Sequence, residues 1–383
     1  EGLNVGCVLT WGPCYDYQRQ FFSPVANNLS ETKALIKYDI EVSGFGSASL
    51  GHVCLLNLSD QTYPGSDGRK DRGWPTWTVP VMRWCKEQGG VTGYPHSAMG
   101  VDAKGAAEYL MAQIAQGNEA PLLPESVDRI DLNADGELTI DELEKSSDRV
   151  ADELPNLALP SMQGKGAMEI FVSVPEGVCD FVSAMDTERI SEWNTWYHLM
   201  NCGFPLKLSG ETDFPCMSSR RVGQGRVYVQ LGEIERLDFV SWVSGLAEGR
   251  SYVSDGFAHA LRFEVDGHSP GTKEVLLDKP GTVRVDAKLA FAPEIPQAVA
   301  YGTLPPKAGR RIVGDTVNLH AKRSETMVSG LTHRVELVVN GTARAAHEVP
   351  GDGQIHDLQF EVPIDESSWV AVRCFPQLHT NPV

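Results

Sequence analysis

The chain has 383 residues, 42% of them apolar, so it can bury a large core in two domains, or in one barrel with an appendage. Its 51 acidic and 33 basic side chains give a formal net charge of −18, which repels phosphate backbones and anionic lipid surfaces and argues against a nucleic-acid partner. No apolar run approaches the roughly 20 residues that a membrane span needs, so no span is predicted.

Short apolar stretches alternate with helical stretches and glycine-rich turns from Glu1 to about Ser254, which is typical of βα units around a mainly parallel sheet. Apolar residues at helical spacing predict an amphipathic helix over 103–116. The predicted strands are 34–40, 53–58, 90–94, 168–174 and 205–209.

After about Phe257 the pattern changes to strict alternation of apolar and polar residues, as in Leu261, Phe263 and Val265 and again over 335–339. Asn340-Gly341 follows directly, a dipeptide that supplies the positive φ angles of a type I′ hairpin turn. Residues 257–383 are therefore predicted to form an antiparallel β-sandwich.

Eight cysteines show no C-x-x-C spacing, which disfavours a zinc ribbon or a thioredoxin-like site. Their number is far below the roughly 8–10% that marks a disulfide scaffold. Buried thiols are expected, and one or two disulfide bridges remain an alternative.

Twelve residues from Asp131 to Glu142 have the pattern of an EF-hand calcium loop. Oxygen-bearing side chains occupy its first, third and fifth positions, glycine the sixth and glutamate the last, which gives Ca²⁺ the oxygen ligands and the sharp bend that it needs. No second loop of this kind occurs, so the hand, an insertion over 118–152, is expected to clip the fold rather than to act as a paired sensor. The predicted calcium-binding residues are Asp131, Asn133, Asp135, Glu137 and Glu142.

Three polar residues follow predicted strands: Glu41 follows 34–40, His96 follows 90–94, and Asp213 follows 205–209. In βα barrels the metal ligands and catalytic groups converge at the carboxyl ends of strands, so these side chains are candidates for one site. His52 precedes a strand instead, so this rule does not place it. Each of these residues alone is more often a satisfied structural group than a ligand.

Taken in order, Glu41, Gly51-His52, Pro95-His96 and Asp213 resemble the later metal-binding motifs of the polymerase-and-histidinol-phosphatase (PHP) superfamily. The resemblance covers nearly the whole chain apart from the calcium insertion. The segments that are similar to the carbaryl-hydrolase-like (CehA/McbA) branch of that superfamily are 196–205, 211–215, 226–229, 245–256, 368–373 and 379–382.

The resemblance implies an α/β fold, with a PHP-like distorted βα barrel over 1–256 that carries the EF-hand insertion and precedes the sandwich. It also implies a metal-dependent hydrolase in which metal-activated water attacks an ester, carbamate or phosphoester bond of a small-molecule substrate. About two divalent transition-metal ions (Zn, Mn or Fe) are expected beside Ca²⁺. The implied metal ligands are Glu41, His52, His96 and Asp213, and the implied catalytic residues are Asp213, His96 and Arg226. Glu41 would bridge the ions, and a surface ion pair is the alternative role for Arg226.

One departure from the superfamily leaves a second function open. PHP proteins open with a His-x-His motif that this chain lacks, so the motif is expected upstream of Glu1, or else the lineage has lost part of its site. In the second case the protein would be a catalytically silent calcium-binding scaffold or recognition protein. A lone EF-hand suits millimolar calcium, so an extracytoplasmic (periplasmic or secreted) location is expected. The oligomeric state stays open.

Overall fold

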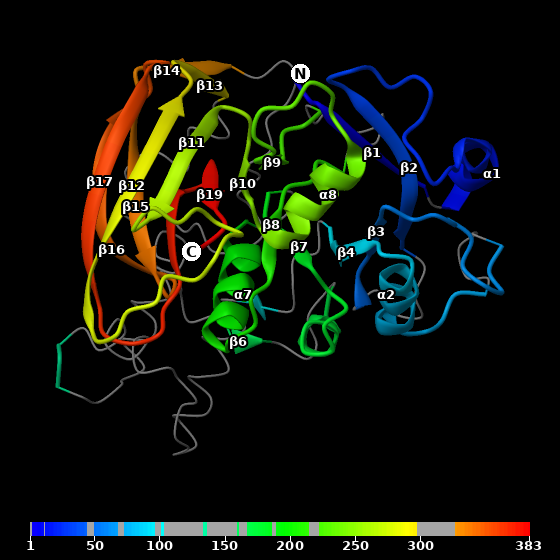
Figure 1. Ribbon diagram of the computed structural model, residues 1–383, viewed down its shortest axis with the longest axis horizontal. Coiled ribbons are helices and arrows are strands. Elements are labelled where there is room, and N and C mark those ends of the chain that lie inside the picture. Colours follow the sequence, from blue (N-terminus) through cyan, green and yellow to red (C-terminus); the bar gives the residue numbers. More distant parts are fainter. Residues whose placement is uncertain are drawn as a thin grey trace.

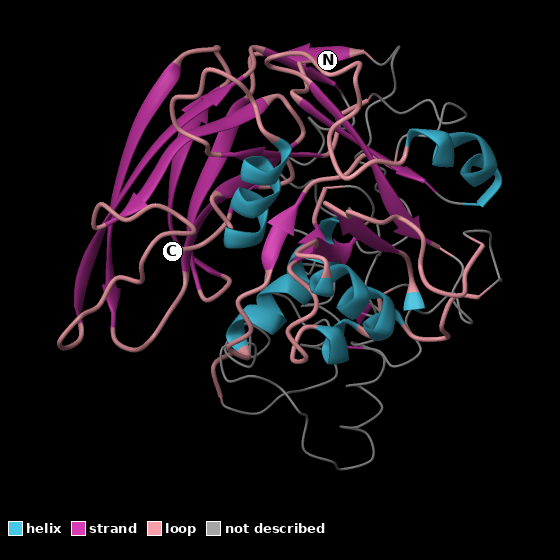
Figure 2. Cartoon of the chain, turned by 45° about the vertical axis from the view of Figure 1, so that its right-hand side comes forward, coloured by secondary structure: helices cyan, strands magenta, loops and turns pink. Residues whose placement is uncertain are grey.

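The computed structural model describes residues 2–10, 12–43, 50–67, 73–95, 101–102, 133–135, 159–160, 167–185, 189–213, 222–296 and 326–383. In these ranges β-strands predominate, arranged in two six-stranded sheets, one three-stranded sheet and two short pairs (Figure 2). No helix in the described part of the chain is both long enough and apolar enough to cross a membrane.

The first six-stranded sheet has the order β1-β2-β3-β4-β7-β8 (Figure 1). All neighbouring pairs are parallel except those of β3, which runs antiparallel to both β2 and β4. β3 and β4 are apolar runs buried on both faces, as expected for central strands of a covered sheet. The strands are β1 (Val5–Thr10), β2 (Leu35–Val42), β3 (Val53–Leu56), β4 (Val91–Tyr94), β7 (Phe181–Ser183) and β8 (Lys207–Ser209).

Helices cover both faces of this sheet. α2 (Thr78–Glu87), α6 (Ile170–Ser173) and α7 (Arg189–Asn201) contribute to one apolar core with Ile40, Leu55 and Val182. α8 (Phe239–Glu248) packs on the opposite face, against Cys54 and Phe181. One turn, α1 (Tyr15–Gln18), lies beside the short helices η1 (Gly12–Cys14) and η2 (Arg19–Phe21).

α8 begins and ends where its sequence dictates. The Asp238 side chain accepts a hydrogen bond from the Ser241 backbone N–H at 2.8 Å, which caps the first turn. Gly249 ends the helix in the left-handed conformation at φ 79°, where a residue with a Cβ would be strained. These two caps fix the first and last residues of α8 and therefore which of its apolar residues face the sheet.

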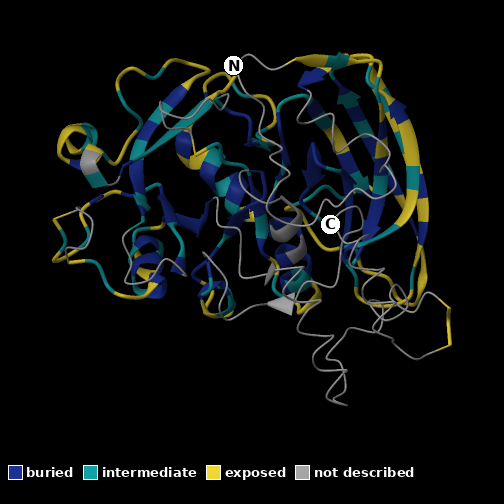
Figure 3. Ribbon diagram, turned by 180° about the vertical axis from the view of Figure 1, so that it is seen from behind, coloured by how far each residue is buried: buried dark blue, intermediate teal, exposed yellow. Residues whose placement is uncertain are grey.

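The second six-stranded sheet has the order β16-β15-β18-β19-β10-β9 and packs face to face on the sheet β11-β12-β17. Alternate residues of both sheets meet in one apolar core, and Figure 3 shows these positions buried while the outward positions are exposed. The strands are β9 (Arg226–Val229), β10 (Ser251–Ser254), β11 (Ala258–Val265), β12 (Gly281–Phe291), β15 (Thr332–Val339), β16 (Thr342–Pro350), β17 (Ile355–Ile364), β18 (Val370–Cys374) and β19 (Leu378–Thr380). The short pairs are β13 (Glu294–Pro296) with β14 (Met327–Ser329) and β5 (Val101–Asp102) with β6 (Leu159–Pro160).

The predicted turn at Asn340-Gly341 is confirmed. It joins β15 to β16, which pair as an antiparallel hairpin, and its residues have φ values of 50° and 84°. The positive φ at both positions is what a type I′ turn requires.

The prediction of an α/β fold with a PHP-like distorted βα barrel is wrong. The first sheet is open, with β1 and β8 as its two outermost strands. In the described chain, β-structure also outweighs helix. A barrel would need the strands after β8 to continue the same sheet. Instead, β9 and β10 leave it, because β10 pairs with β9 on one side and with β19 on the other. The second sheet thus crosses the predicted boundary at 256/257.

Two of the predicted elements have other outcomes. The predicted strand 168–174 is wrong, since Ile170–Ser173 forms α6, with the Glu169 carbonyl accepting hydrogen bonds from Val172 and Ser173. A short apolar run cannot distinguish a buried helical turn from a buried strand. The predicted helix 103–116 lies outside the described residues.

Candidate functional site

The carboxyl ends of five parallel strands lie along one edge of the first sheet. β1, β2, β4, β7 and β8 all run toward this edge, and β3 starts there because it runs the opposite way. Glu41, near the end of β2, and His52, just before β3, therefore share the edge. Asp213 follows β8 by four residues. This edge is the candidate site.

Glu41 and His52 are in direct contact. His52 Nδ1 lies 2.7 Å from Glu41 Oε1, with side chains that are 37% and 19% exposed. The pairing of β2 with β3 sets the two backbones side by side, so this contact follows from the antiparallel insertion of β3. The structure thus brings together two of the predicted metal ligands.

Cys54 and Glu211 extend this pair on the face that α8 covers. Cys54 lies directly opposite Glu41 in the β2–β3 register, and its thiol donates to Glu211 Oε2 at 3.6 Å. β3 and β8 are separated by two strands, so the contact shows that the connection after β8 reaches back across the end of the sheet. Burial, reinforced by the Glu211 and Glu41 carboxylates, raises the pKa of the Cys54 thiol well above its ordinary value. A cation placed between these groups would have the opposite effect.

Ser183 ends β7 on the same face. It stands two residues after Phe181, which contacts α8, so the two side chains point the same way. Its hydroxyl is fully buried and has no hydrogen-bond partner among the residues that the structure describes. A buried hydroxyl without a partner is costly and is a reason to expect a ligand or an ion at this edge.

Asp213 is exposed and has a left-handed backbone, with φ 44°. The segment that carries it is held by the Thr212 hydroxyl, which donates to the Gly225 carbonyl at 3.0 Å. Asp213 is therefore an accessible carboxylate on the connection that leaves the site.

Arg226 is buried rather than paired at the surface. Its Nε donates to the Gly223 carbonyl, and its guanidinium packs where a Cβ on Gly256 would lie. The pKa of His259 is lowered mainly by the burial of its own ring and, in second place, by the positive charge of Arg226. Arg226 thus lies near Tyr252 of β10 and His259 of β11.

Several predicted residues lie outside the described ranges: His96, and Asp131, Glu137 and Glu142 of the calcium loop. Asn133 and Asp135 are described, and both are exposed. The Asp135 N–H donates to Asn133 Oδ1 at 2.9 Å, across Ala134 with φ 59°. All seven described cysteines are free thiols.

Sequence reasoning missed Cys54, Ser183 and Glu211 as parts of this edge. Glu211 stands two residues after Ser209 at the end of β8, so the rule that selected Asp213, a polar residue after a strand, applies to it as well. Cys54 stands two residues after His52, so period-two alternation from His52 would have found it.

The donor set suits a divalent ion in part. Carboxylates and imidazole are ligands of Zn, Mn and Fe, and two ligands at roughly 2.1 Å from one tetrahedral ion lie about 3.4 Å apart. The Glu41–His52 contact of 2.7 Å is a direct hydrogen bond, so the two groups would have to separate slightly to bind one ion. Within the described ranges, no three His, Cys, Asp or Glu side chains form a group that could hold a metal ion. Comparison with protein-family models, curated proteins and solved structures found no match for this chain.

Proposed function

We propose that the protein is a metal-dependent hydrolase that cleaves an ester-type bond of a small molecule at the carboxyl edge of the first sheet. The contact of Glu41 with His52 is the observation that carries the proposal, because it joins a carboxylate and an imidazole at the edge where parallel strands end. Glu211 and Asp213 reach the same edge from β8. An edge of this kind is where open sheets with parallel strands bind ligands.

Glu41 and His52 would hold the ion. Glu211, which accepts a hydrogen bond from the neighbouring Cys54 thiol, is the further carboxylate that could join them. When bound, a divalent ion supplies a water molecule whose pKa is lowered toward neutrality. Asp213 is exposed at the edge and would accept a proton at its carboxylate. The unpartnered Ser183 hydroxyl would donate to an oxygen of the substrate.

The test combines metal content with hydrolysis. The purified protein is analysed for transition metals and assayed on p-nitrophenyl acetate and bis-p-nitrophenyl phosphate. Glu41→Gln and His52→Asn should each lower kcat/KM by about 100-fold or more, a typical loss for a group in the reacting machinery, together with the bound transition metal.

A matched control is available at the tip of the sandwich. His356 Nε2 lies 2.9 Å from Asp352 Oδ1, a histidine–carboxylate contact far from the edge in sequence. His356→Asn should leave metal content and hydrolysis unchanged. A protein without transition metal, or edge variants as active as the parent, would refute the proposal and leave the scaffold alternative.

Calcium binding is proposed as a separate, structural function. Asn133 and Asp135 are exposed and stand at the third and fifth positions of the loop pattern, where a hard cation takes oxygen ligands. Calcium titration followed by thermal melting tests this, and an unchanged melting temperature between millimolar Ca²⁺ and EGTA would contradict it.

A further inference from the structure

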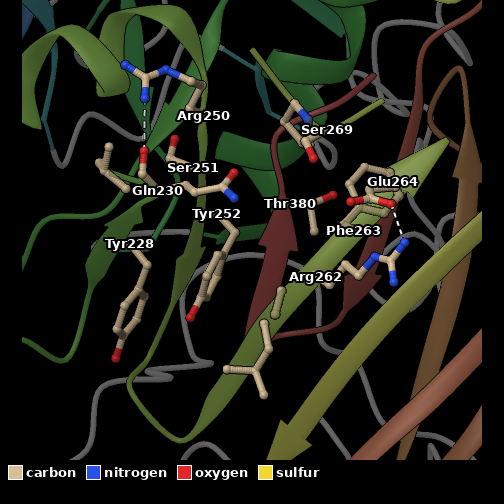
Figure 4. A pocket seen from close by; sticks show the side chains of 14 residues that line it. Tyr228, Gln230, Arg250, Ser251, Tyr252, Arg262, Phe263, Glu264, Ser269 and Thr380 are labelled. Carbon is tan, nitrogen blue, oxygen red and sulfur yellow. Dashed lines mark hydrogen bonds and ion pairs between the residues drawn. The ribbon is translucent and has the colours of Figure 1, made fainter. Parts of the chain in front are cut away.

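A cavity of about 270 Å³ lies between the paired strands β9 and β10 and strand β11 (Figure 4), and neither Glu41 nor His52 lines it. One wall is formed by Tyr228 and Tyr252, and the other by β11. A water molecule occupies roughly 30 Å³ in the liquid, so the space exceeds what one or two ordered waters fill. The remaining lining residues are Val229, Gln230, Arg250, Ser251, Ala260, Leu261, Arg262, Phe263, Glu264, Ser269, Pro270 and Thr380.

The aromatic wall is rigid. Tyr228 and Tyr252 are directly opposite in the β9–β10 register, and their rings stack at 4.8 Å with an interplanar angle of 9°. His259 packs edge-on against Tyr228 at 5.0 Å, and its Nδ1 lies 3.1 Å from the Tyr252 hydroxyl. Figure 4 shows the two tyrosines side by side, pointing the same way. Each stacked ring covers one face of the other, so the wall can offer a ligand the remaining flat, apolar face of a ring.

The polar groups around the cavity come in neutral pairs. Arg250 Nε lies 2.6 Å from Glu248, and its Nη1 donates to the Gln230 carbonyl at 2.9 Å. Arg262 lies 2.5 Å from Glu264. Each guanidinium has five N–H donors, and these contacts use two of them on Arg250 and one on Arg262. The cavity therefore offers donors and acceptors side by side without an excess of positive charge.

The three observations exclude two classes of ligand. An anion would need an arginine that is not already matched by a carboxylate, and the chain carries a net charge of −18. A wholly apolar ligand would remove water from the arginines and from Glu264 without replacing their hydrogen bonds. A ring with one apolar face and several hydroxyls satisfies both walls.

We propose that this cavity binds a neutral saccharide, with a sugar ring against Tyr252 and its hydroxyls toward Arg262 and Glu264. The tyrosine pair receives the C–H face of the ring. Paired guanidinium and carboxylate groups match neighbouring hydroxyls, each of which donates and accepts. The exposed Gln230, Leu261 and Arg262 leave the rim open to a longer chain. This site is independent of the hydrolase proposal, since none of the edge residues lines the cavity.

The test is saturation-transfer difference NMR and titration calorimetry with maltotriose, cellotriose and xylotriose, each up to 10 mM. Glucuronate and inorganic phosphate serve as anionic probes. At least one trisaccharide should bind, and both anions should bind more weakly. Tyr252→Ala should weaken binding about tenfold or more through loss of the ring, whereas Tyr252→Phe should stay within about threefold.

Arg262→Ala is the second test variant. It should leave the folded core intact, because the Arg262 side chain is 46% exposed. It should weaken trisaccharide binding about fivefold or more by removing a charged donor. Arg284 is the matched control: it is exposed, pairs with Asp286 two residues on at 2.7 Å, and does not line the cavity, so Arg284→Ala should bind normally. The proposal is overturned if no trisaccharide binds, if an anion binds more tightly, or if both Tyr252→Ala and Arg262→Ala bind as the parent does.

Discussion

His379 ends a buried chain of hydrogen bonds that is suited to a neutral imidazole. Arg373 Nη1 donates to the Tyr197 hydroxyl at 3.1 Å, and that hydroxyl lies 2.7 Å from His379 Nε2. His379 Nδ1 lies 2.7 Å from the Thr380 carbonyl. Because a carbonyl can only accept, Nδ1 carries the hydrogen, and Nε2 accepts from Tyr197. A second proton on the ring would break this chain.

Protonation of His379 is therefore less favourable in the folded protein than in the unfolded chain. Burial, opposed by the Thr380 carbonyl and aided by Arg373, lowers the pKa of His379 from 6.5 to about 3. Below pH 6.5 the unfolded chain therefore binds a proton that the folded chain does not, so stability present above pH 6.5 is lost as the pH falls toward 3. At pH 5 the difference is 1.5 pH units, or about 2 kcal/mol at 1.36 kcal/mol per unit.

Urea unfolding at pH 7.5 and pH 5.0 measures this loss. The parent should lose about 2 kcal/mol more than His379→Gln over this interval, because glutamine does not titrate. Comparing the two losses cancels the cost of the substitution itself. His356→Gln, a substitution of the second residue of β17, is the control and should lose as much as the parent. Equal losses in the parent and in His379→Gln would refute the reasoning.

Three further predictions concern other sites. Lys37→Met should lower the free energy of unfolding by about 3–5 kcal/mol in urea titrations, because it leaves the fully buried Asp39 without the cation that lies 2.9 Å from it in the parent. A decrease below about 1 kcal/mol, as is typical of an ion pair at an exposed site, would contradict this. EGTA should lower the melting temperature, and Asp135→Ala should abolish the calcium-dependent part of that shift without changing the kinetics of the folded protein. Asp213→Asn should abolish aryl-ester hydrolysis while changing the melting temperature little, because Asp213 is exposed and asparagine also tolerates its φ of 44°; full activity would mean that Asp213 has no catalytic role.

Local sequence patterns predicted strands well where the chain is apolar and bounded by turns. The predicted strands 53–58, 90–94 and 205–209 contain β3, β4 and β8, and Asn340-Gly341 forms the predicted hairpin. Apolar runs failed at 168–174, where the same burial is met by a helical turn. Leu261 also breaks the expected alternation, since a register shift between Ala260 and Arg262 turns it outward.

The candidate site was only half accessible to the same reasoning. Glu41 and Asp213 were selected by the rule that ligands follow parallel strands; Glu41 lies near the end of β2, and Asp213 stands four residues beyond β8. The position of His52 required the direction of β3, which no local pattern encodes. Cys54 and Glu211 meet across two intervening strands because the connection after β8 returns over the end of the sheet, a long-range path that no local pattern encodes.

The sequence by itself determined which segments are buried, where the chain turns and which side chains carry charge. It predicted the hairpin at Asn340-Gly341, and it contains the net charge of −18 and the calcium-loop pattern around Asn133 and Asp135. Only the tertiary structure decided that β3 enters between parallel neighbours, that β9 and β10 join the second sheet instead of closing a barrel, and that His52 therefore contacts Glu41. The physical reason is that periodicity reports how a segment meets its core, whereas the choice of neighbouring strand depends on long-range pairing, curvature and packing.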